Sequence, residues 1–178
     1  MRLFVALPMP EDVQSEVSWL GNDLREGSCV PEEQVHLTLR FLGERPEHEL
    51  GDLIGALSEI DLAPLELTVK GVGLFPGRGQ PRVAWAGVER SEELDALQRS
   101  VDRAIERAGV PRERRKFHPH LTVARFNGTR AKTLVPWLQE HSLFGIEPFT
   151  VDEFRLYSSV LRPEGAHHRV EESFALGD

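Results

Sequence analysis

Apolar residues in the first half of the chain form short continuous runs separated by segments with helical spacing. Continuous runs at 3–7, 35–42 and 65–75 predict three strands. Apolar residues that recur every three or four positions at 13–24 and at 50–57 predict two helices between them. The predicted order is therefore strand, helix, strand, helix, strand.

The second half repeats this order. A strand is predicted at 82–88, a helix at 91–108 with one apolar side, and a strand at 121–126. A shorter helix is expected to begin near Pro136, because proline suits the first turn of a helix and not its interior. The recurrence of element order suggests an internal duplication.

Two closing strands, at 149–161 and 169–176, complete the pattern. We expect an α+β fold in a single two-lobed domain over residues 1–178, with duplicated halves of about 1–80 and 81–178. The two lobes would be related by a pseudo-twofold axis, with antiparallel sheets around a central cleft and helices on the outer faces.

A four-residue motif occurs once in each half. His36-Leu37-Thr38-Leu39 returns as His120-Leu121-Thr122-Val123. Successive side chains of a strand alternate between its faces, so the His and Thr of each copy point the same way and the Leu between them points to the opposite layer. Each copy therefore presents an imidazole beside a hydroxyl.

Two matched imidazoles suit the chemistry of phosphodiesters. A histidine with its usual pKa near about 6.5 can lend or accept a proton at neutral pH. With a cyclic phosphate between them, His120 could take the proton of an attacking water while protonated His36 donates to the leaving ribose oxygen. Thr38 and Thr122 could each donate a hydrogen bond to a non-bridging phosphate oxygen. This scheme needs no metal and no cofactor.

An arginine follows each motif, with one additional residue in the second copy. Arg125 is the candidate for the strongest phosphate contact, as a charge-assisted pair. Strict alternation places it on the face opposite His120, so a bulge or a strand end near Ala124 is required to turn it inward. Arg40 is a further candidate for contact with an RNA base or backbone.

Three other residues near the motifs have two interpretations each. Phe41 and Phe126 could stack on a nucleobase at the rim of the cleft, or lie in the core. His118 could form a metal site with His120 and His36, but no carboxylate cluster or cysteine accompanies it. We therefore expect His118 to flank the site.

The remaining histidines and the tryptophans are given structural roles. Solvated or capping positions are expected for His48, His141, His167 and His168. Core packing is expected first, and base stacking second, for Trp19, Trp85 and Trp137.

Composition limits the classes of function. The chain has 178 residues, 40% of them hydrophobic, and a formal net charge of -8 that argues against coating nucleic acid by bulk electrostatics. A positive patch over 112–116 could guide a phosphate backbone or be a solvated loop. The single cysteine, Cys29, excludes an internal disulfide. With no signal peptide or membrane span in the sequence, we expect a cytoplasmic monomer.

The pattern as a whole resembles the two-histidine (2H) phosphoesterases, and most closely their RNA 2′,3′-cyclic phosphodiesterase branch, also called 2′-5′ RNA ligases. The resemblance rests on Arg2–Ala6, His36–Glu44, Phe75-Pro76, Arg82–Trp85, Pro119–Arg125 and Phe154–Ser159. It departs from the family at Cys29, where relatives often carry tryptophan, and at His168, where many carry tyrosine.

The resemblance implies a bilobal fold and hydrolysis of a terminal RNA 2′,3′-cyclic phosphate to a 2′-phosphomonoester. It implies that His36 is the proton donor, His120 the acceptor and Arg125 a phosphate ligand. Expected partners are RNA or nucleotide ends with a cyclic phosphate, tRNA fragments among them, and some relatives also ligate. The alternatives are a non-catalytic RNA-end binder that uses the cleft as a phosphate clamp and, third, a metal-dependent hydrolase.

Overall fold

A computed structural model describes residues 1–177. The strands are β1 (Arg2–Pro8), β2 (Ser28–Cys29), β3 (His36–Glu44), β4 (Leu65–Phe75), β5 (Val83–Val88), β6 (His120–Arg125), β7 (Gly145–Val151), β8 (Glu153–Arg162) and β9 (Gly165–Ala175). The α-helices are α1 (Glu11–Trp19), α2 (Leu50–Ser58), α3 (Glu92–Arg107) and α4 (Val135–Glu140). Short 3₁₀ turns are η1 (Leu20–Asp23), η2 (Glu32–Gln34), η3 (Glu47–Glu49) and η4 (Ala131–Leu134).

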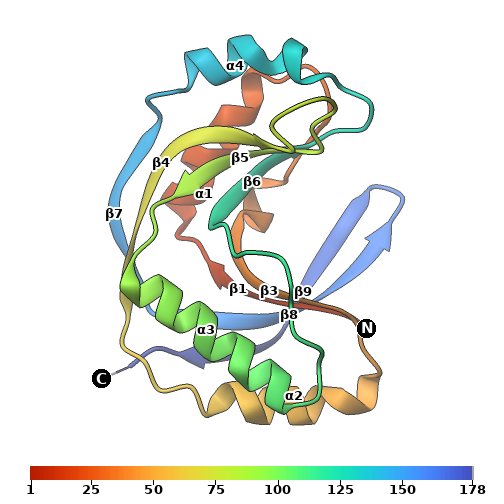
Figure 1. The fold of residues 1–178 in the computed structure, drawn as a ribbon, viewed down its shortest axis with the longest axis vertical. Coiled ribbons are helices and arrows are strands. Elements are labelled where there is room, and N and C mark those ends of the chain that lie inside the picture. Colours follow the sequence, from red (N-terminus) through yellow and green to blue (C-terminus); the bar gives the residue numbers. More distant parts are fainter. Residues whose placement is uncertain (178) are drawn as a thin grey trace.

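All strands belong to one antiparallel sheet that opens into two lobes. The strand order is β7-β4-β5-β6-β3-β1-β8-β9, with β2 added beside β6. The two motif strands β3 and β6 meet through a single residue pair, Leu37 with Leu121, and then diverge like the arms of a V (Figure 1). The expected bilobal α+β fold is confirmed, with the two sheets continuous at this one point.

The helices cover the outer faces of the two lobes. α2 and α3 pack against each other and against β9, β3 and β4, on the lobe that contains β1 and β8 (Figure 1). α1 contacts β6, and the indole of Trp137 in α4 donates a hydrogen bond to the carbonyl of Leu20, 2.9 Å away, which fixes α4 beside the end of α1. The opposite face of the sheet, between the arms, is left uncovered.

Each lobe takes strands from both halves of the chain. β1 pairs with β3 on one side and with the late strand β8 on the other, while the early strand β4 pairs with β5 and β7. The predicted single strand over 149–161 is wrong, because Val151 pairs with Leu65 in one lobe and Glu153 pairs with Ala175 in the other. A run of apolar residues indicates burial but not which strand is the partner. The division of this segment into two strands could therefore not be predicted from its own residues. The internal duplication itself stays a prediction.

Several helix boundaries follow the local signals. The predicted helix at 91–108 corresponds to α3, whose preceding residue Ser91 caps it by accepting a hydrogen bond from the Leu94 backbone N–H at 3.1 Å. Pro136 lies in the first turn of α4, as expected. The predicted helix at 13–24 is shorter than expected, because α-helical geometry ends at Trp19 and gives way to the 3₁₀ turn η1.

Burial corrects one side-chain prediction near α4. Trp137 is buried as expected, but Trp19 is 56% exposed and does not belong to the core. His141, predicted to be solvated or capping, is the C-cap residue of α4; it is only 5% exposed and its Nε2 lies 2.9 Å from the Asp23 carboxylate. It joins α4 to η1. No helix among residues 1–177 is both long and apolar enough to span a membrane.

Candidate active site

The single β3–β6 pair creates a group of four polar side chains. Since the two leucines at this pair are wholly buried, their neighbours along each strand point to the other, open face. His36 and Thr38 flank Leu37, and His120 and Thr122 flank Leu121, so the four side chains lie on that face around the shared pair. All four side chains are half-buried. Two imidazoles and two hydroxyls from two lobes therefore share the base of one cleft.

Backbone carbonyls orient both imidazoles in the same way. Nδ1 of His36 lies 2.6 Å from the Gln34 carbonyl, and Nδ1 of His120 lies 2.7 Å from the His118 carbonyl. A carbonyl only accepts, so each Nδ1 carries hydrogen and donates it. Nε2 is then the reactive nitrogen of each ring. That of His36 lies 3.1 Å from the hydroxyl of Thr38.

Burial keeps both rings neutral in the unliganded protein. It lowers the pKa of His36 to about 4, with further lowering by the charges of His168, Arg125 and His120. Burial also lowers the pKa of His120, assisted by the charges of His118 and Arg125. At pH 7 each Nε2 is therefore unprotonated and has a free lone pair. One ring must gain a proton before it can act as an acid.

Aromatic side chains and a second histidine pack around the ring of His36. Its ring stacks on Phe4 with centroids 5.1 Å apart, and Phe4 stacks on Tyr157 at 5.0 Å and 10°. His168 meets Phe4 edge-on at 4.9 Å and His36 at 5.4 Å. The prediction that His168 is merely solvated or capping is wrong, because the β8–β9 pairing brings it beside the first motif histidine. The one signal for this in the sequence was the family position where relatives carry tyrosine.

The second lobe repeats this arrangement with other residues. His120 meets Phe75 edge-on at 5.0 Å, and His118 meets the same ring at 4.9 Å. His118 also lies 5.2 Å from Trp85, which places it on the flank of the site, where it was expected. Within residues 1–177 the only cluster of potential metal ligands joins Asp23, Glu140 and His141, and it includes neither motif histidine.

A bulge turns Arg125 toward the histidines. In the β5–β6 register Trp85 pairs with Thr122 and Ala84 with Ala124, so Val123 is an extra residue. Val123 and Ala124 are both buried and Arg125 is exposed, on the same face as Thr122. The charge of Arg125 contributes to the lowered pKa of His36, His120 and His168. The strand thus contains the irregularity that an inward Arg125 requires.

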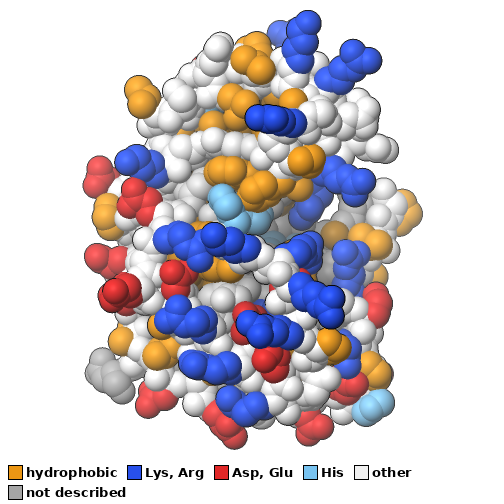
Figure 2. Space-filling view, viewed as in Figure 1, with side chains coloured by type: hydrophobic (Ala, Val, Ile, Leu, Met, Phe, Trp, Pro, Cys, Tyr) orange, Lys and Arg blue, Asp and Glu red, His pale blue; other side chains and the backbone are white. Residues whose placement is uncertain are grey.

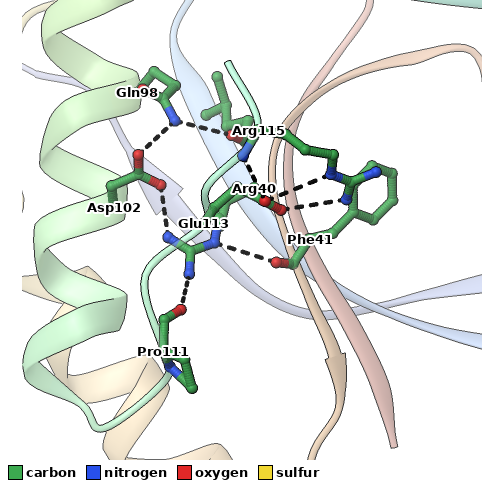
Figure 3. Close-up of polar contacts among 8 residues, drawn as sticks. Arg40, Phe41, Gln98, Asp102, Pro111, Glu113 and Arg115 are labelled. Carbon is green, nitrogen blue, oxygen red and sulfur yellow. Dashed lines mark hydrogen bonds and ion pairs between the residues drawn. The ribbon is translucent and has the colours of Figure 1, made fainter. Parts of the chain in front are cut away.

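The same bulge in β3 places Arg40 elsewhere. Ala6 pairs with Thr38 and Val5 with Arg40, so Leu39 is the extra residue and Arg40 lies on the buried face, 3% exposed. Its guanidinium donates to Asp102 at 2.8 Å and to the Pro111 carbonyl at 2.5 Å (Figure 3). The prediction that Arg40 contacts RNA is therefore wrong.

The two phenylalanines near the motifs have different surroundings. Phe41 is 49% exposed on the cleft side, where its ring lies 6.1 Å from Phe4. Phe126 is 8% exposed and packs so closely on Gly27 that a Cβ there would lie 2.4 Å from its ring. Of the two interpretations of Phe126, this burial confirms the core position and excludes base stacking, whereas Phe41 remains a candidate for base stacking.

The positive patch over 112–116 is partly neutralised. The Arg115 guanidinium lies 3.3 Å from the Glu113 carboxylate and also donates to its other oxygen (Figure 3). The Arg115 backbone N–H, which donates to the Glu113 carboxylate at 2.9 Å, lowers the pKa of Glu113 most, and these side-chain hydrogen bonds lower it further. Even so, Lys and Arg side chains surround the hollow between the lobes, in which histidine is visible (Figure 2). A cavity of about 600 Å³ adjoins His36, lined also by Arg155 and Tyr157.

The fold and the paired motifs define a two-histidine phosphoesterase. A family model described as the 2′-5′ RNA ligase superfamily matches residues 14–161. The chain is 34% identical over 168 residues to the RNA 2′,3′-cyclic phosphodiesterase of Archaeoglobus fulgidus, covering 93% of this chain and 94% of the relative. The Thermus thermophilus protein of the same name is 36% identical over 187 residues, covering 99% and 90%. This chain belongs to the 2′-5′ RNA ligase superfamily.

Solved structures agree with the fold. The crystal structure of TT0787 of Thermus thermophilus matches with a TM-score of 0.86 and 35% identity over 100% of both chains. That of Escherichia coli LigT complexed with 3′-AMP matches with a TM-score of 0.80 over 99% of this chain and 98% of LigT. LigT is 24% identical and indicates the fold alone.

Proposed function

We propose that this protein is an RNA 2′,3′-cyclic phosphodiesterase that opens a terminal cyclic phosphate to a 2′-phosphomonoester. One observation carries the proposal: the pairing of Leu37 with Leu121 brings the histidine and threonine of both motifs to one face, and each imidazole turns Nδ1 to a backbone carbonyl and leaves Nε2 for the substrate. An in-line displacement at phosphorus needs a base on one side and an acid on the other, and this arrangement supplies both.

The proposed reaction uses the Nε2 atom of one histidine as base and that of the other as acid. His120 Nε2 takes a proton from water, whose oxygen bonds to phosphorus. The bond between phosphorus and the ribose 3′ oxygen breaks, and protonated His36 gives its Nε2 proton to that oxygen. The 2′ oxygen keeps the phosphate, and the two imidazoles together end with one proton, as they began. No metal is assigned to this scheme, and ligation would be the reverse type of reaction at the same site.

Substrate binding allows His36 to take up a proton from solvent. In the free protein the pKa of His36 is about 4, so the ring cannot act as an acid at neutral pH. A phosphate anion beside His36 favours its charged form and raises its pKa. The acid is thus formed mainly in the complex. Which ring donates follows the family resemblance, which assigns donation to His36.

The remaining contacts stabilise the phosphate. Thr38 and Thr122 donate hydrogen bonds to its non-bridging oxygens, where charge builds in the transition state. Arg125 adds a charge-assisted pair from the second lobe. We expect RNA ends, tRNA fragments included, as substrates, and a monomer acting in the cytoplasm.

The test measures 2′-phosphate released from a 2′,3′-cyclic nucleotide in the presence of a chelator. His36→Ala and His120→Ala should each lower kcat/KM by about 10²- to 10⁴-fold, the usual contribution of an acid or base. His48→Ala, an exposed histidine in η3, serves as control. Folding of each variant is checked by circular dichroism.

The outcomes separate the alternatives. Retained turnover in either motif variant contradicts the proposal. A wild-type protein that binds the cyclic end without releasing product is the RNA-end binder. Loss of activity with the chelator alone indicates the metal-dependent hydrolase.

A further inference from the structure

Two arginines face the cleft without a protein partner. Neither Arg2 nor Arg125 has an ion pair or a side-chain hydrogen bond with any residue from 1 to 177. Arg40, Arg45 and Arg155 each pair with a carboxylate, and exposed arginines such as Arg99 and Arg112 do not, so what distinguishes Arg2 and Arg125 is that both face the cleft. In a chain with a net charge of -8, acidic partners are abundant. Two cations left free in one cleft indicate a site for an anion.

The direction of Arg2 follows from its strand. β1 pairs with β8 without a register shift from Arg2 to Ala6, so its side chains alternate regularly. Leu3 is 1% exposed and belongs to the core under the helices, whereas Phe4 points to the other face, where its ring stacks on His36. Arg2 shares the face of Phe4. It extends from the strand on the open side, one pleat farther toward the rim.

Arg125 approaches from the other arm of the V. The bulge at Val123 turns it to the cleft face of β6, and β6 diverges from β3 beyond the shared base (Figure 1). The two guanidiniums are close enough that the charge of Arg2 lowers the pKa of Arg125, after the larger effect of burial. Two like charges held near each other in one cleft become favourable when anions lie between them.

The acidic residue that pairs with Arg2 in the sheet does not neutralise it. Glu44 is its register partner on β3, but its carboxylate lies 3.5 Å from the amino group of Met1 and makes no ion pair with Arg2. Arg2 therefore stays available to a ligand.

The number of phosphates distinguishes the substrates. A 2′,3′-cyclic mononucleotide with a free 5′ hydroxyl carries one anion, which the threonines and Arg125 would hold between the histidines. An RNA end carries a second anion, the phosphodiester on the 5′ side of its last nucleotide. Only the longer substrate offers Arg2 a partner.

We propose that Arg2 binds this 5′ phosphodiester while Arg125 holds the cyclic phosphate, so that the cleft selects RNA ends over mononucleotides. The inference rests on the function proposed above. The ligand class is an oligoribonucleotide of at least two residues with a 2′,3′-cyclic terminus.

The experiment compares two substrates with the same terminal nucleotide, a cyclic mononucleotide and a dinucleotide with a cyclic phosphate. In the wild-type protein kcat/KM should be higher for the dinucleotide. In Arg2→Gln the ratio of the two kcat/KM values should fall about tenfold, and the salt dependence for the dinucleotide should weaken by about one unit of slope. Arg99→Gln removes the same charge from an exposed position on α3 and should leave the ratio unchanged.

A binding measurement separates this inference from the proposed function. The 2′-phosphate products of the two substrates are titrated into wild type, Arg2→Gln and Arg2→Lys. The glutamine variant should lose the dinucleotide's advantage and the lysine variant should keep part of it. If wild type turns over neither substrate, the phosphodiesterase proposal fails while this titration still decides the role of Arg2. An equal ratio in wild type and Arg2→Gln, in turnover or in binding, overturns the inference.

Discussion

The two motif strands have the same backbone and different chemistry. In both, a bulge falls three residues after the histidine, at Leu39 in β3 and at Val123 in β6. The next position is buried and the one after it faces the cleft. In β3 these are Arg40 and Phe41, and in β6 they are Ala124 and Arg125.

This comparison separates what is shared from what is specialised. Acid and base require two equivalent imidazoles, and the pair of motifs provides them symmetrically. The cleft-facing position after the bulge breaks that symmetry, because one arm presents an apolar ring and the other a cation. A phosphate is therefore attracted to the β6 side, and the β3 side is left for the less polar part of a nucleotide.

The buried position is specialised too. Ala124 is wholly buried in a space that needs no polar partner, whereas Arg40 in the equivalent place ties β3 to α3 through Asp102 and to the loop after α3 through Pro111 (Figure 3). At this position the side chain of the first motif strand makes an ionic contact, and that of the second only packs.

The largest expected effect tests the cleft-facing pair. Arg125→Met should lower kcat/KM for a cyclic nucleotide by about 10²- to 10³-fold, as when one donor to a developing oxyanion is removed. Phe41→Leu should lower it by less than about tenfold, because leucine keeps an apolar contact and loses only the lower part of the about 1 to 3 kcal/mol that a stacked base contributes. Steady-state kinetics on both variants measures the difference. Equal losses of kcat/KM in the two variants would contradict the proposed difference in function between Phe41 and Arg125.

A smaller effect is expected for the buried pair. Arg40→Met leaves the Asp102 carboxylate without its cation, and should lower the free energy of unfolding by about 1 to 3 kcal/mol, less than for a fully enclosed pair because Asp102 is partly exposed. Urea unfolding measures it. Arg45→Met is the matched control, since its i,i+4 pair with Glu49 should contribute no more than about 0.5 kcal/mol. A midpoint unchanged by Arg40→Met contradicts the structural role.

The last prediction concerns the pH dependence that the two histidines give to stability. The pKa of folded His36 is about 4, so between its ordinary pKa of about 6.5 and pH 4 the unfolded chain binds a proton that the folded chain does not. Stability therefore decreases as the pH falls through this window, by at most about 1.4 kcal/mol per pH unit for one such group.

Urea unfolding at several pH values from 6.5 to 4 measures how the free energy of unfolding changes with pH. His36→Gln should flatten the slope more than His120→Gln, whose parent histidine is less enclosed by the protein. His48→Gln should leave the slope as in wild type. A steeper slope in His36→Gln would reverse the sign predicted here.

Most local structure was predictable because it depends on local spacing. The strand predicted at 65–75 coincides with β4, and α3 lies within one residue of its predicted bounds at each end. The motif repeat also predicted which four side chains share a face, since alternation along a strand is a local rule. The need for a bulge before an inward Arg125 followed from the same rule.

Partner choice was not predictable, because it depends on segments distant in the chain. The split of 149–161 between β7 and β8 reflects two different neighbours, β4 and β1. The same cause explains His168, which reaches His36 only because β9 follows β8 across the sheet. Arg40 was misjudged, and the choice between core and cleft stayed open for Phe126, because a bulge decides which side of the strand faces the core.

The amino-acid sequence by itself determined most helices and strands, the paired histidines and hydroxyls, and the family, because periodicity and motifs depend only on the order of residues in the chain. Only the tertiary structure decided that the two motif strands touch at one residue pair, that Phe41 and Arg125 occupy equivalent places, and that Arg2 faces the same cleft. Strand pairing and bulges are set by the burial of many distant residues at once, and no local pattern records them.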